Sequence, residues 1–383
     1  MTLTRDPSTE RARPLRVLLV CEYHAKYATN LARGLADHGC DIMLLSRDHE
    51  FEFGGDRDEA EPGALRRYVR EVLGDRGRHR ELRGRVRDPR GVAPMLARRR
   101  EVAAFAPDVV HLQESVWLDP RFFVAAGTRR KRYAVTIHDP SLHPGESESL
   151  LERLGRRQSL RHAGLIFVHS VALKAELVDL ARPAAPVVVV PHGTQVPAPT
   201  PVPQPPHLLF FGRFSIYKGI DVLLDAMPKV WDAVPDARLT LAGAGDLPAH
   251  PLLGDPRVAV RHEHVREAHV PALFSSARLV VLPYRQASQS GVGSRAKTYG
   301  RGLVVTDVGG LAELVADGSG EVVRAEDSVA LANALTNILS VPGRAEELGR
   351  RAAQGAAESS WPRVAGRTIA SYRNHLGAGS GEG

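Results

Sequence analysis

The sequence lacks several features that mark secreted, membrane-spanning and metal-binding proteins. Only two cysteines are present, Cys21 and Cys40, so a disulfide scaffold is excluded and a reducing compartment is indicated. No apolar run approaches the roughly 20 residues of a membrane span, and the N-terminus is too polar for a signal peptide. The neighbouring His262, His264 and His269 lack the spacing of a metal site. We therefore expect a cytoplasmic protein without a bound metal or other cofactor.

Two common nucleotide-binding motifs are also missing. Residues 21–24 read CEYH after the first apolar segment, where a dinucleotide-binding enzyme would carry G-x-G-x-x-G, and no P-loop lysine motif occurs. The composition is otherwise that of an ordinary globular protein, with 43% hydrophobic and 25% charged residues among 383. A chain of this length is expected to form two or three domains.

The positive charge of the chain is concentrated in one segment. The formal net charge is +7, whereas the window 66–100 alone holds 13 arginines and four acids. Because the basic character is local, a nucleic-acid-binding protein is disfavoured. Arg66, Arg67 and Arg70 lie on one side of a predicted amphipathic helix. The segment could contact an anionic membrane surface or a phosphorylated or acidic partner, or it could be a solvated helix face.

Short apolar segments alternate with helical segments along the whole chain. This alternation predicts an α/β fold with parallel sheets. The expected strands are Arg16–Cys21, Asp41–Leu45, Val109–Leu112, Tyr133–Ile137, Leu165–Val168, Val187–Val190, His207–Phe211, Arg238–Ala242, Val258–Arg261, Leu279–Leu282 and Leu303–Thr306. The expected helices include Ala28–His38, Leu65–Leu73, Val92–Phe105, Gly219–Val234 and Val270–Ser275.

A proline-rich segment divides the chain into two similar halves. Pro197–Pro206 carries six prolines, which donate no hydrogen bonds to a sheet, so a linker is favoured over a loop within one domain. We expect one Rossmann-like domain over residues 1–196 and another over 207–360, with a ligand-binding cleft between them. Residues 361–376 are expected to form a helix that returns to the first domain, and 377–383 a disordered tail.

The strongest candidate for chemistry is the segment Gly212–Gly219, which reads GRFSIYKG. It follows a predicted strand and precedes a long helix, so Arg213, Lys218 and a helix N-terminus are brought together. Two cations beside free backbone N–H groups suit a diphosphate. The alternative is a solvated loop with ordinary surface charges.

Another strand-to-helix turn contains Gln289–Val292, with the sequence QSGV. Ser290 and Gly291 are suited to begin a helix whose first N–H groups point at an anion. The alternative is a simple serine cap.

A third turn carries Gly309 and Gly310 within TDVGGLAE. Two glycines after a strand allow a ligand to approach the backbone closely. Glu313 could accept hydrogen bonds from ligand hydroxyls, or it could be a first-turn acid that interacts with its own helix dipole.

In the first half, His138 and Asp139 follow the predicted strand that ends at residue 137. Ligands of parallel sheets bind at the carboxyl ends of strands. His138 could therefore hydrogen-bond a sugar hydroxyl, with Asp139 or a backbone group fixing its tautomer. A structural histidine at the strand end is the alternative.

The order and spacing of these segments resemble retaining glycosyltransferases of the GT-B fold, family 4. In the second half the resemblance is carried by GRFSIYKG, LTLAGAGD, VVLPYRQASQSGV and GRGLVVTDVGGLAELV. The first half is similar more weakly, through VTIHDPSLHP, LIFVHS and VVVVPHG. The resemblance implies two Rossmann-like domains. It also implies transfer of a sugar from a nucleotide diphosphate donor to an acceptor, with retained configuration and no required metal.

The resemblance also implies roles for individual residues. Arg213 and Lys218 would neutralise the diphosphate leaving group, and His138 would contact the donor sugar. The implied donor-binding residues are Gly212, Gln289, Ser290, Gly291, Val292, Gly309, Gly310 and Glu313. The acceptor-side candidates are Tyr23, His24, Asp139, Arg66, Arg67 and Arg70.

Two departures from the family pattern stand out. The usual pair of glutamates, the first near the donor sugar and the second on the ribose, falls on Ala287 and Arg295. A guanidinium donates hydrogen bonds and cannot accept them from ribose hydroxyls. The first strand-to-helix turn, residues 22–27, reads EYHAKY in place of the usual paired glycines.

These departures keep more than one function open. An active glycosyltransferase using a sugar, phosphosugar or lipid-linked acceptor is the first interpretation. A pseudo-glycosyltransferase coupling an activated cyclitol, or an enzyme that uses a phosphorylated acceptor, is the second. A non-catalytic nucleotide-binding homologue and a same-fold epimerase are further alternatives.

Overall fold

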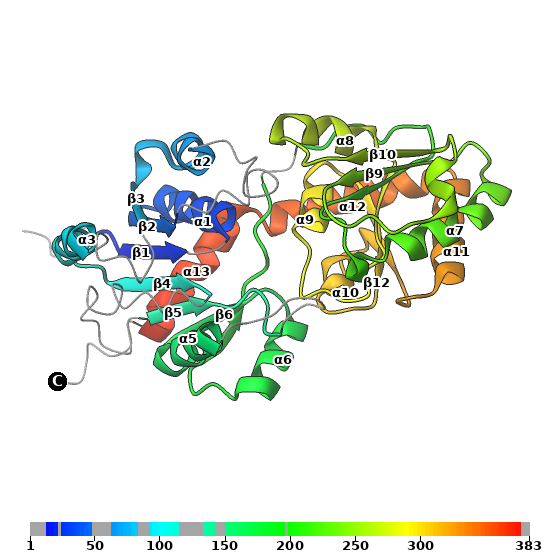
Figure 1. Cartoon of the computed structure of the whole chain (residues 1–383). Coiled ribbons are helices and arrows are strands. Elements are labelled where there is room, and N and C mark those ends of the chain that lie inside the picture. The colour runs from blue at the N-terminus through cyan, green and yellow to red at the C-terminus, as the bar shows by residue number, and fades with distance from the viewer. Residues whose placement is uncertain are drawn as a thin grey trace, which may run out of the picture.

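The computed structural model describes residues 13–21, 24–47, 63–82, 92–114, 133–141, 150–195 and 198–376. Their strands form two separate parallel sheets. One has the strand order β3-β2-β1-β4-β5-β6-β7, and the other has the order β10-β9-β8-β11-β12-β13. Helices cover both sheets (Figure 1). The prediction of two Rossmann-like α/β domains is therefore confirmed.

The first sheet is built from alternating apolar residues that pack on both of its faces. Val17 and Leu19 of β1 belong to one buried cluster with α1 and α13, while Leu18 and Val20 belong to another with α3 and α6. A strand buried on both faces has no polar positions, which explains the apolar run of residues 17–20. The strands are β1 (Arg16–Cys21), β2 (Asp41–Arg47), β3 (Arg78–Leu82), β4 (Val109–Gln113), β5 (Tyr133–Thr136), β6 (Leu165–Val168) and β7 (Val187–Val189). The helices are α1 (Ala25–Asp37), α2 (Ala64–Leu73), α3 (Val92–Phe105), α5 (Leu150–His162) and α6 (Val171–Ala181).

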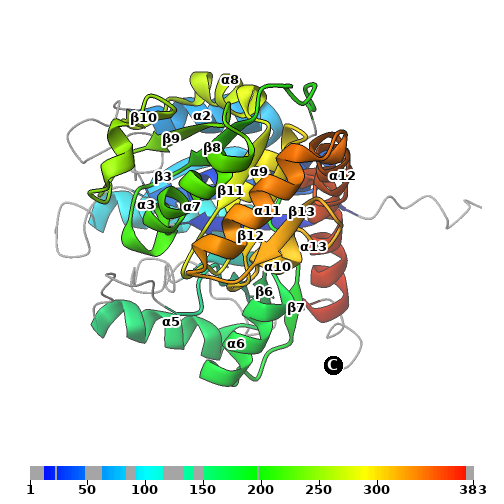
Figure 2. The ribbon, with the colours of Figure 1, turned by 90° about the vertical axis from the view of Figure 1, so that its right-hand side faces the viewer.

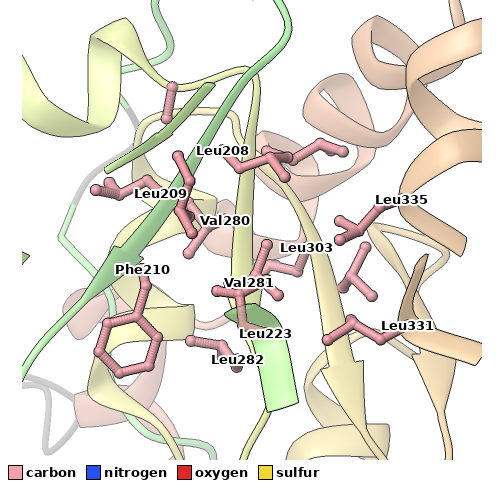
Figure 3. Packing of buried hydrophobic residues seen from close by; sticks show 14 of the residues in the cluster. Leu208, Leu209, Phe210, Leu223, Val280, Val281, Leu282, Leu303, Leu331 and Leu335 are labelled. Carbon is pink, nitrogen blue, oxygen red and sulfur yellow. The ribbon is translucent and has the colours of Figure 1, made fainter. Parts of the chain in front are cut away.

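The second sheet has a single continuous core. Figure 3 shows residues of this core, among them Phe210 of β8, Val281 of β11, Leu303 of β12 and Leu335 of α11. The strands are β8 (His207–Phe211), β9 (Arg238–Gly243), β10 (Val258–His262), β11 (Leu279–Leu282), β12 (Gly302–Thr306) and β13 (Gly320–Val323). The helices and short turns used below are η6 (Ile216–Lys218), α7 (Ile220–Ala233), η8 (Glu267–His269), α8 (Val270–Ser276), α9 (Gly291–Thr298), α10 (Leu311–Leu314), α11 (Ser328–Ser340) and α12 (Arg344–Glu358).

The last helix, α13 (Trp361–Leu376), packs on the first half of the chain. Figure 2 shows α12 and α13 following one another along one side of the molecule. A Cβ at Gly34 of α1 would lie 2.9 Å from the Ala365 Cβ, so this glycine lets α1 and α13 approach closely. The chain thus crosses between the halves a second time, after residue 360.

The structure contains two strands that the sequence did not predict. β3 (RHREL) and β13 (GEVV) each lie at one edge of their sheet. An edge strand is covered on fewer sides, so its residues need not form an apolar run. The first helix also begins earlier than expected, at Ala25, and its N-cap residue His24 has a left-handed φ of 62°.

Candidate active site

Several of the predicted site residues lie where the two halves of the chain meet. Contacts across this boundary include Lys26 of α1 with Glu267 of η8, whose Nζ and Oε1 atoms are 2.8 Å apart. The negative charge of Asp139, after β5, acts to raise the pKa of Lys218, after β8. Residues that follow strands of both sheets therefore lie close together, as the strand-end rule for parallel sheets requires.

His138 is buried, with 2% of its surface exposed. Its ring stacks on His24, with centroids 3.9 Å apart, and meets the edge of Tyr27. Burial lowers the pKa of His138 well below its usual value, and the neighbouring histidines lower it further. Burial likewise lowers the pKa of His169 to about 3 and that of His192 to about 4. His138 is therefore a neutral imidazole at physiological pH.

Glu114 is a site residue that sequence reasoning missed. One of its carboxylate oxygens, Oε1, accepts hydrogen bonds from the backbone N–H groups of His138 (2.9 Å) and Asp139 (3.0 Å). Its φ of 55° turns the chain just after β4. The carboxylate thereby fixes the backbone that follows β5. A signal for the position of Glu114, though not for its role, was available, since it lies two residues after the predicted strand Val109–Leu112 and ligands of parallel sheets bind at such strand ends.

Three side chains in this region have atoms that could ligate a cation. Single ligand atoms of His24, Glu114 and Asp139 all lie within 4.8 Å of one another. Glu114 already accepts two backbone hydrogen bonds, and its other oxygen lies 3.9 Å from His24 Nε2. We interpret the group as part of the polar lining of the site.

The loop 212–219 is held in place by a close backbone approach. Gly219 has φ of 65°, and a Cβ there would lie 1.9 Å from the carbonyl oxygen of Pro283. Only glycine fits this position. The preceding η6 turn thereby places Lys218 against the residues that follow β11.

Lys218 is half-buried and faces an aromatic ring. Its Nζ lies 3.6 Å from the ring centroid of Tyr284 and 5.0 Å from that of Tyr217. Burial lowers the pKa of Lys218 to about 8, and the positive charge of Arg213 also lowers it. Among the described residues no carboxylate lies within ion-pair distance of Nζ. A bound anion would offset the desolvation of this cation.

The turn before α9 forms a capped helix start. Ser290 Oγ accepts a hydrogen bond from the N–H of Gly293 at 3.2 Å, so the serine caps the helix. The N–H groups of Gly291 and Val292 occupy the first two helical positions, which have no intrahelical acceptor. The side-chain oxygen of Gln289 is buried without a partner in the described structure. The serine-cap interpretation and an anion site at the same helix start are thus compatible.

Glu313 contacts the first half of the chain. Its two carboxylate oxygens accept hydrogen bonds from the first N–H groups of α6, at Val171 (2.8 Å) and Ala172 (2.7 Å). Ser170 accepts the next one, from Leu173. Glu313, from the second half, therefore caps a helix of the first half.

The two glycines before α10 lie against the turn that follows β11. A Cβ at Gly309, which has φ of 51°, would lie 1.5 Å from the Ala287 carbonyl oxygen. Gly310 donates its N–H to the carbonyl of Ser288 at 3.0 Å. These glycines hold two loops of the second half together.

The positions of the missing glutamates are occupied in different ways. Ala287 is buried. Arg295 lies within 3.3 Å of Glu267 Oε1, which also binds Lys26. Burial would raise the pKa of Glu267, but the charges of Arg295 and Lys26 outweigh this effect and lower it. A carboxylate is therefore present beside Arg295, supplied by another element.

The arginines of α2 are not brought to His138. Arg66 pairs with Glu81 of β3 at 2.7 Å, and β3 is four strands away from β5, about 19 Å at the usual strand spacing. Arg67 and Arg70 are exposed. Residue 23, the remaining acceptor-side candidate, lies outside the described residues.

The two parallel α/β domains, with candidate ligand residues at facing strand ends, define a GT-B-type fold. Residues 205–341 match the family model described as "Glycosyl transferases group 1", and residues 24–193 match "Glycosyl transferase 4-like domain". Each half of the chain thus matches a domain model of glycosyltransferases, which supports a transferase enzyme.

Several characterised proteins are similar to the chain. The D-inositol 3-phosphate glycosyltransferase of Arthrobacter sp. (strain FB24) is 32% identical over 176 residues, 43% of this chain and 42% of that protein. The chain therefore spans less than half the length of this relative. The glycogen synthase of Mycobacterium tuberculosis is 28% identical over 294 residues, 70% of this chain and 69% of that protein.

Solved structures share the fold at low identity. Sucrose-phosphate synthase from Thermosynechococcus elongatus superimposes with a TM-score of 0.70 at 20% identity, covering 95% of this chain and 100% of that one. Anabaena HepE in complex with UDP-glucose gives 0.65 at 16% identity, covering 93% and 100%. Among the described residues no helix is long and apolar enough to cross a membrane.

Proposed function

We propose that the protein transfers a sugar from a nucleotide diphosphate donor to an acceptor, with retained anomeric configuration. The observation that carries this proposal is Lys218, a half-buried cation with no described carboxylate partner, beside Arg213 and near the helix start at Ser290. As the bond between sugar and diphosphate breaks, negative charge accumulates on the leaving group. Fixed cations and helix N–H groups stabilise that charge most in the transition state. The same cations supply the stabilisation for which other transferases use a metal ion.

The proposal assigns the donor to the second half of the chain. Its diphosphate would lie between Arg213, Lys218 and the first N–H groups of α9, with the sugar toward His138. A uridine nucleotide is favoured as the first candidate because the structurally similar HepE was solved with UDP-glucose. We further propose that Glu267 supplies the ribose-binding carboxylate that position 295 lacks, since Glu267 and Arg295 are in contact.

The acceptor would enter from the first half of the chain. Glu114, Asp139 and His24 offer groups that bind hydroxyls. A phosphorylated acceptor is one candidate, because the named relatives include a D-inositol 3-phosphate glycosyltransferase and a sucrose-phosphate synthase. A plain sugar and a lipid-linked sugar are the others.

The second candidate function is that of a pseudo-glycosyltransferase. The observation that favours it is Ala287, which places no carboxylate where the family carries its first glutamate. A cyclitol donor forms no ordinary glycosidic bond and would not need that acid. Normal turnover with a common sugar nucleotide and a plain sugar acceptor would reject this alternative.

A ligand screen followed by a turnover assay tests the main proposal. We expect UDP, ADP or GDP, or one of their glucose conjugates, to raise the melting temperature, since a ligand at 100 times its Kd adds about 2.7 kcal/mol. The stabilising sugar nucleotide should then be consumed only when an acceptor is added. Consumption without an acceptor would indicate an epimerase or hydrolase, and no stabilisation by any nucleotide would reject the proposal.

We also propose a cytoplasmic location with peripheral membrane contact through the segment 66–100. Ion pairs reduce the available charge of this segment, because Arg80 and Arg98 both bind Glu101, and Arg76 binds Asp37. Arg70 of α2 is exposed. Co-sedimentation with anionic vesicles at low salt tests the contact, and equal binding to neutral vesicles would reject it.

A further inference from the structure

Four neighbouring strands end in a single row of polar groups. Gln113 ends β4, His138 follows β5, His169 follows β6 and Val190 follows β7, and these strands are adjacent in the sheet. The side chains of Gln113, His138 and His169 are all buried. Hydrogen-bond distances link them in order: 3.2 Å from Gln113 to His138 Nε2, 3.2 Å from His138 Nδ1 to His169 Nε2, and 3.0 Å from His169 Nδ1 to the Val190 carbonyl.

The carbonyl at the end of this row determines which nitrogen carries each proton. A carbonyl oxygen only accepts, so His169 must carry its proton on Nδ1. Because buried His169 is neutral, its Nε2 has a lone pair and must accept from His138 Nδ1–H. Since His138 is also neutral, its Nε2 is left with a lone pair.

The amide of Gln113 supplies independent support for this direction. With its oxygen toward His138, two acceptors would face each other, and its nitrogen is buried with no partner in the described structure. Rotating the amide by 180° removes both conflicts, since the NH2 group then donates to His138 Nε2. Each group in the row donates to the next, from Gln113 through both histidines to Val190.

We infer that His169 is a positioning residue that fixes His138 as the tautomer with its proton on Nδ1, so that His138 acts through Nε2 as a hydrogen-bond acceptor. This inference rests on the proposed function for its catalytic consequence: a donor-sugar hydroxyl would replace the Gln113 amide as the group that donates to His138 Nε2, and His138 would not serve as a general acid. The fixed lone pair also orients the ring, because rotating it would break the bond to His169.

Two substitutions of similar size separate positioning from packing. In His169→Gln the side-chain oxygen replaces Nε2, so it still accepts from His138. In His169→Asn the amide replaces Nδ1, so the bond to Val190 is kept and the acceptor for His138 is lost. We expect His169→Asn to lower kcat/KM for the sugar nucleotide at least tenfold and His169→Gln to lower it less than threefold. The affinity for the nucleoside diphosphate alone should change less than twofold in both. Equal losses in the two variants would overturn the positioning role.

The tautomer itself can be measured on the unmodified chain without any donor or acceptor. Protein labelled with ¹⁵N in its histidine rings gives distinct nitrogen shifts for protonated and unprotonated sites, and the His138→Gln spectrum identifies the His138 signals. We expect a protonated Nδ1 and an unprotonated Nε2. A proton on Nε2 would overturn the inference even if the protein proves to be an active glycosyltransferase. If the expected tautomer is found but the protein has no transferase activity, the proposed function is rejected and the inference about His169 stands.

Discussion

At the scale of single residues, Lys218 is the group on which the proposed chemistry depends most. Lys218→Ala and Arg213→Ala should each lower turnover at least tenfold, about 1.4 kcal/mol of transition-state stabilisation. Steady-state kinetics with the sugar nucleotide measures this loss. Lys229→Ala, an exposed lysine on α7, is the matched control and should behave as the wild type. Unchanged kinetics in both test variants would contradict the diphosphate role.

The lowered pKa of Lys218 predicts a pH dependence of anion binding. Its cation is the form that binds a diphosphate, and it is lost in the unliganded protein as pH rises through about 8. Nucleoside diphosphate affinity should therefore weaken between pH 7 and 9.5, as isothermal titration calorimetry would measure. In the unfolded chain the pKa of this lysine is about 10.5. Between pH 8 and 10.5 the unfolded chain therefore holds more protons at this group than the folded chain does. The contribution of Lys218 to the free energy of unfolding of the unliganded protein thus increases with pH over this range. Constant affinity over this range would show that Lys218 does not bind the anion.

At the scale of elements, the glycine turns position the site loops. Gly219→Ala and Gly309→Ala would each introduce a Cβ that overlaps a carbonyl oxygen at a positive φ. Such strain alone costs on the order of 1–3 kcal/mol. We expect a clearly lower melting temperature by calorimetry. Gly254→Ala, where no heavy atom lies within 4 Å of the new Cβ, is the control and should be nearly neutral.

The elements also show which parts of the fold the sequence could predict. Buried central strands such as β1 were predicted because both of their faces are apolar, whereas the edge strands β3 and β13 were missed because polar residues there are tolerated. Candidate site residues were selected because ligands of parallel sheets bind at the carboxyl ends of strands. The roles of Glu114 and Glu313 could not be predicted, since the partners of their carboxylates are backbone N–H groups of elements distant in sequence.

At the scale of the whole molecule, the contacts between the halves include an ion pair and a helix cap. Lys26 binds Glu267, and Glu313 caps α6. The second contact uses both carboxylate oxygens on two consecutive N–H groups, so it restrains the relative orientation of the halves more than the single bond of Lys26. The arrangement observed is therefore one in which the two halves of the chain are already in contact.

Removing that cap should favour separation of the two halves. In Glu313→Ala the N–H groups of Val171 and Ala172 lose their carboxylate acceptor. When the halves separate, water can accept hydrogen bonds from these groups, so the open arrangement becomes relatively more favourable. We expect a larger radius of gyration by small-angle X-ray scattering and faster proteolysis of residues 194–206. A bound nucleotide should reverse part of both changes, because a ligand that contacts both halves stabilises the closed arrangement. Asp232→Ala, an exposed acid on α7, should leave the scattering unchanged. If Glu313→Ala matches that control in both measurements, the cap does not hold the halves together.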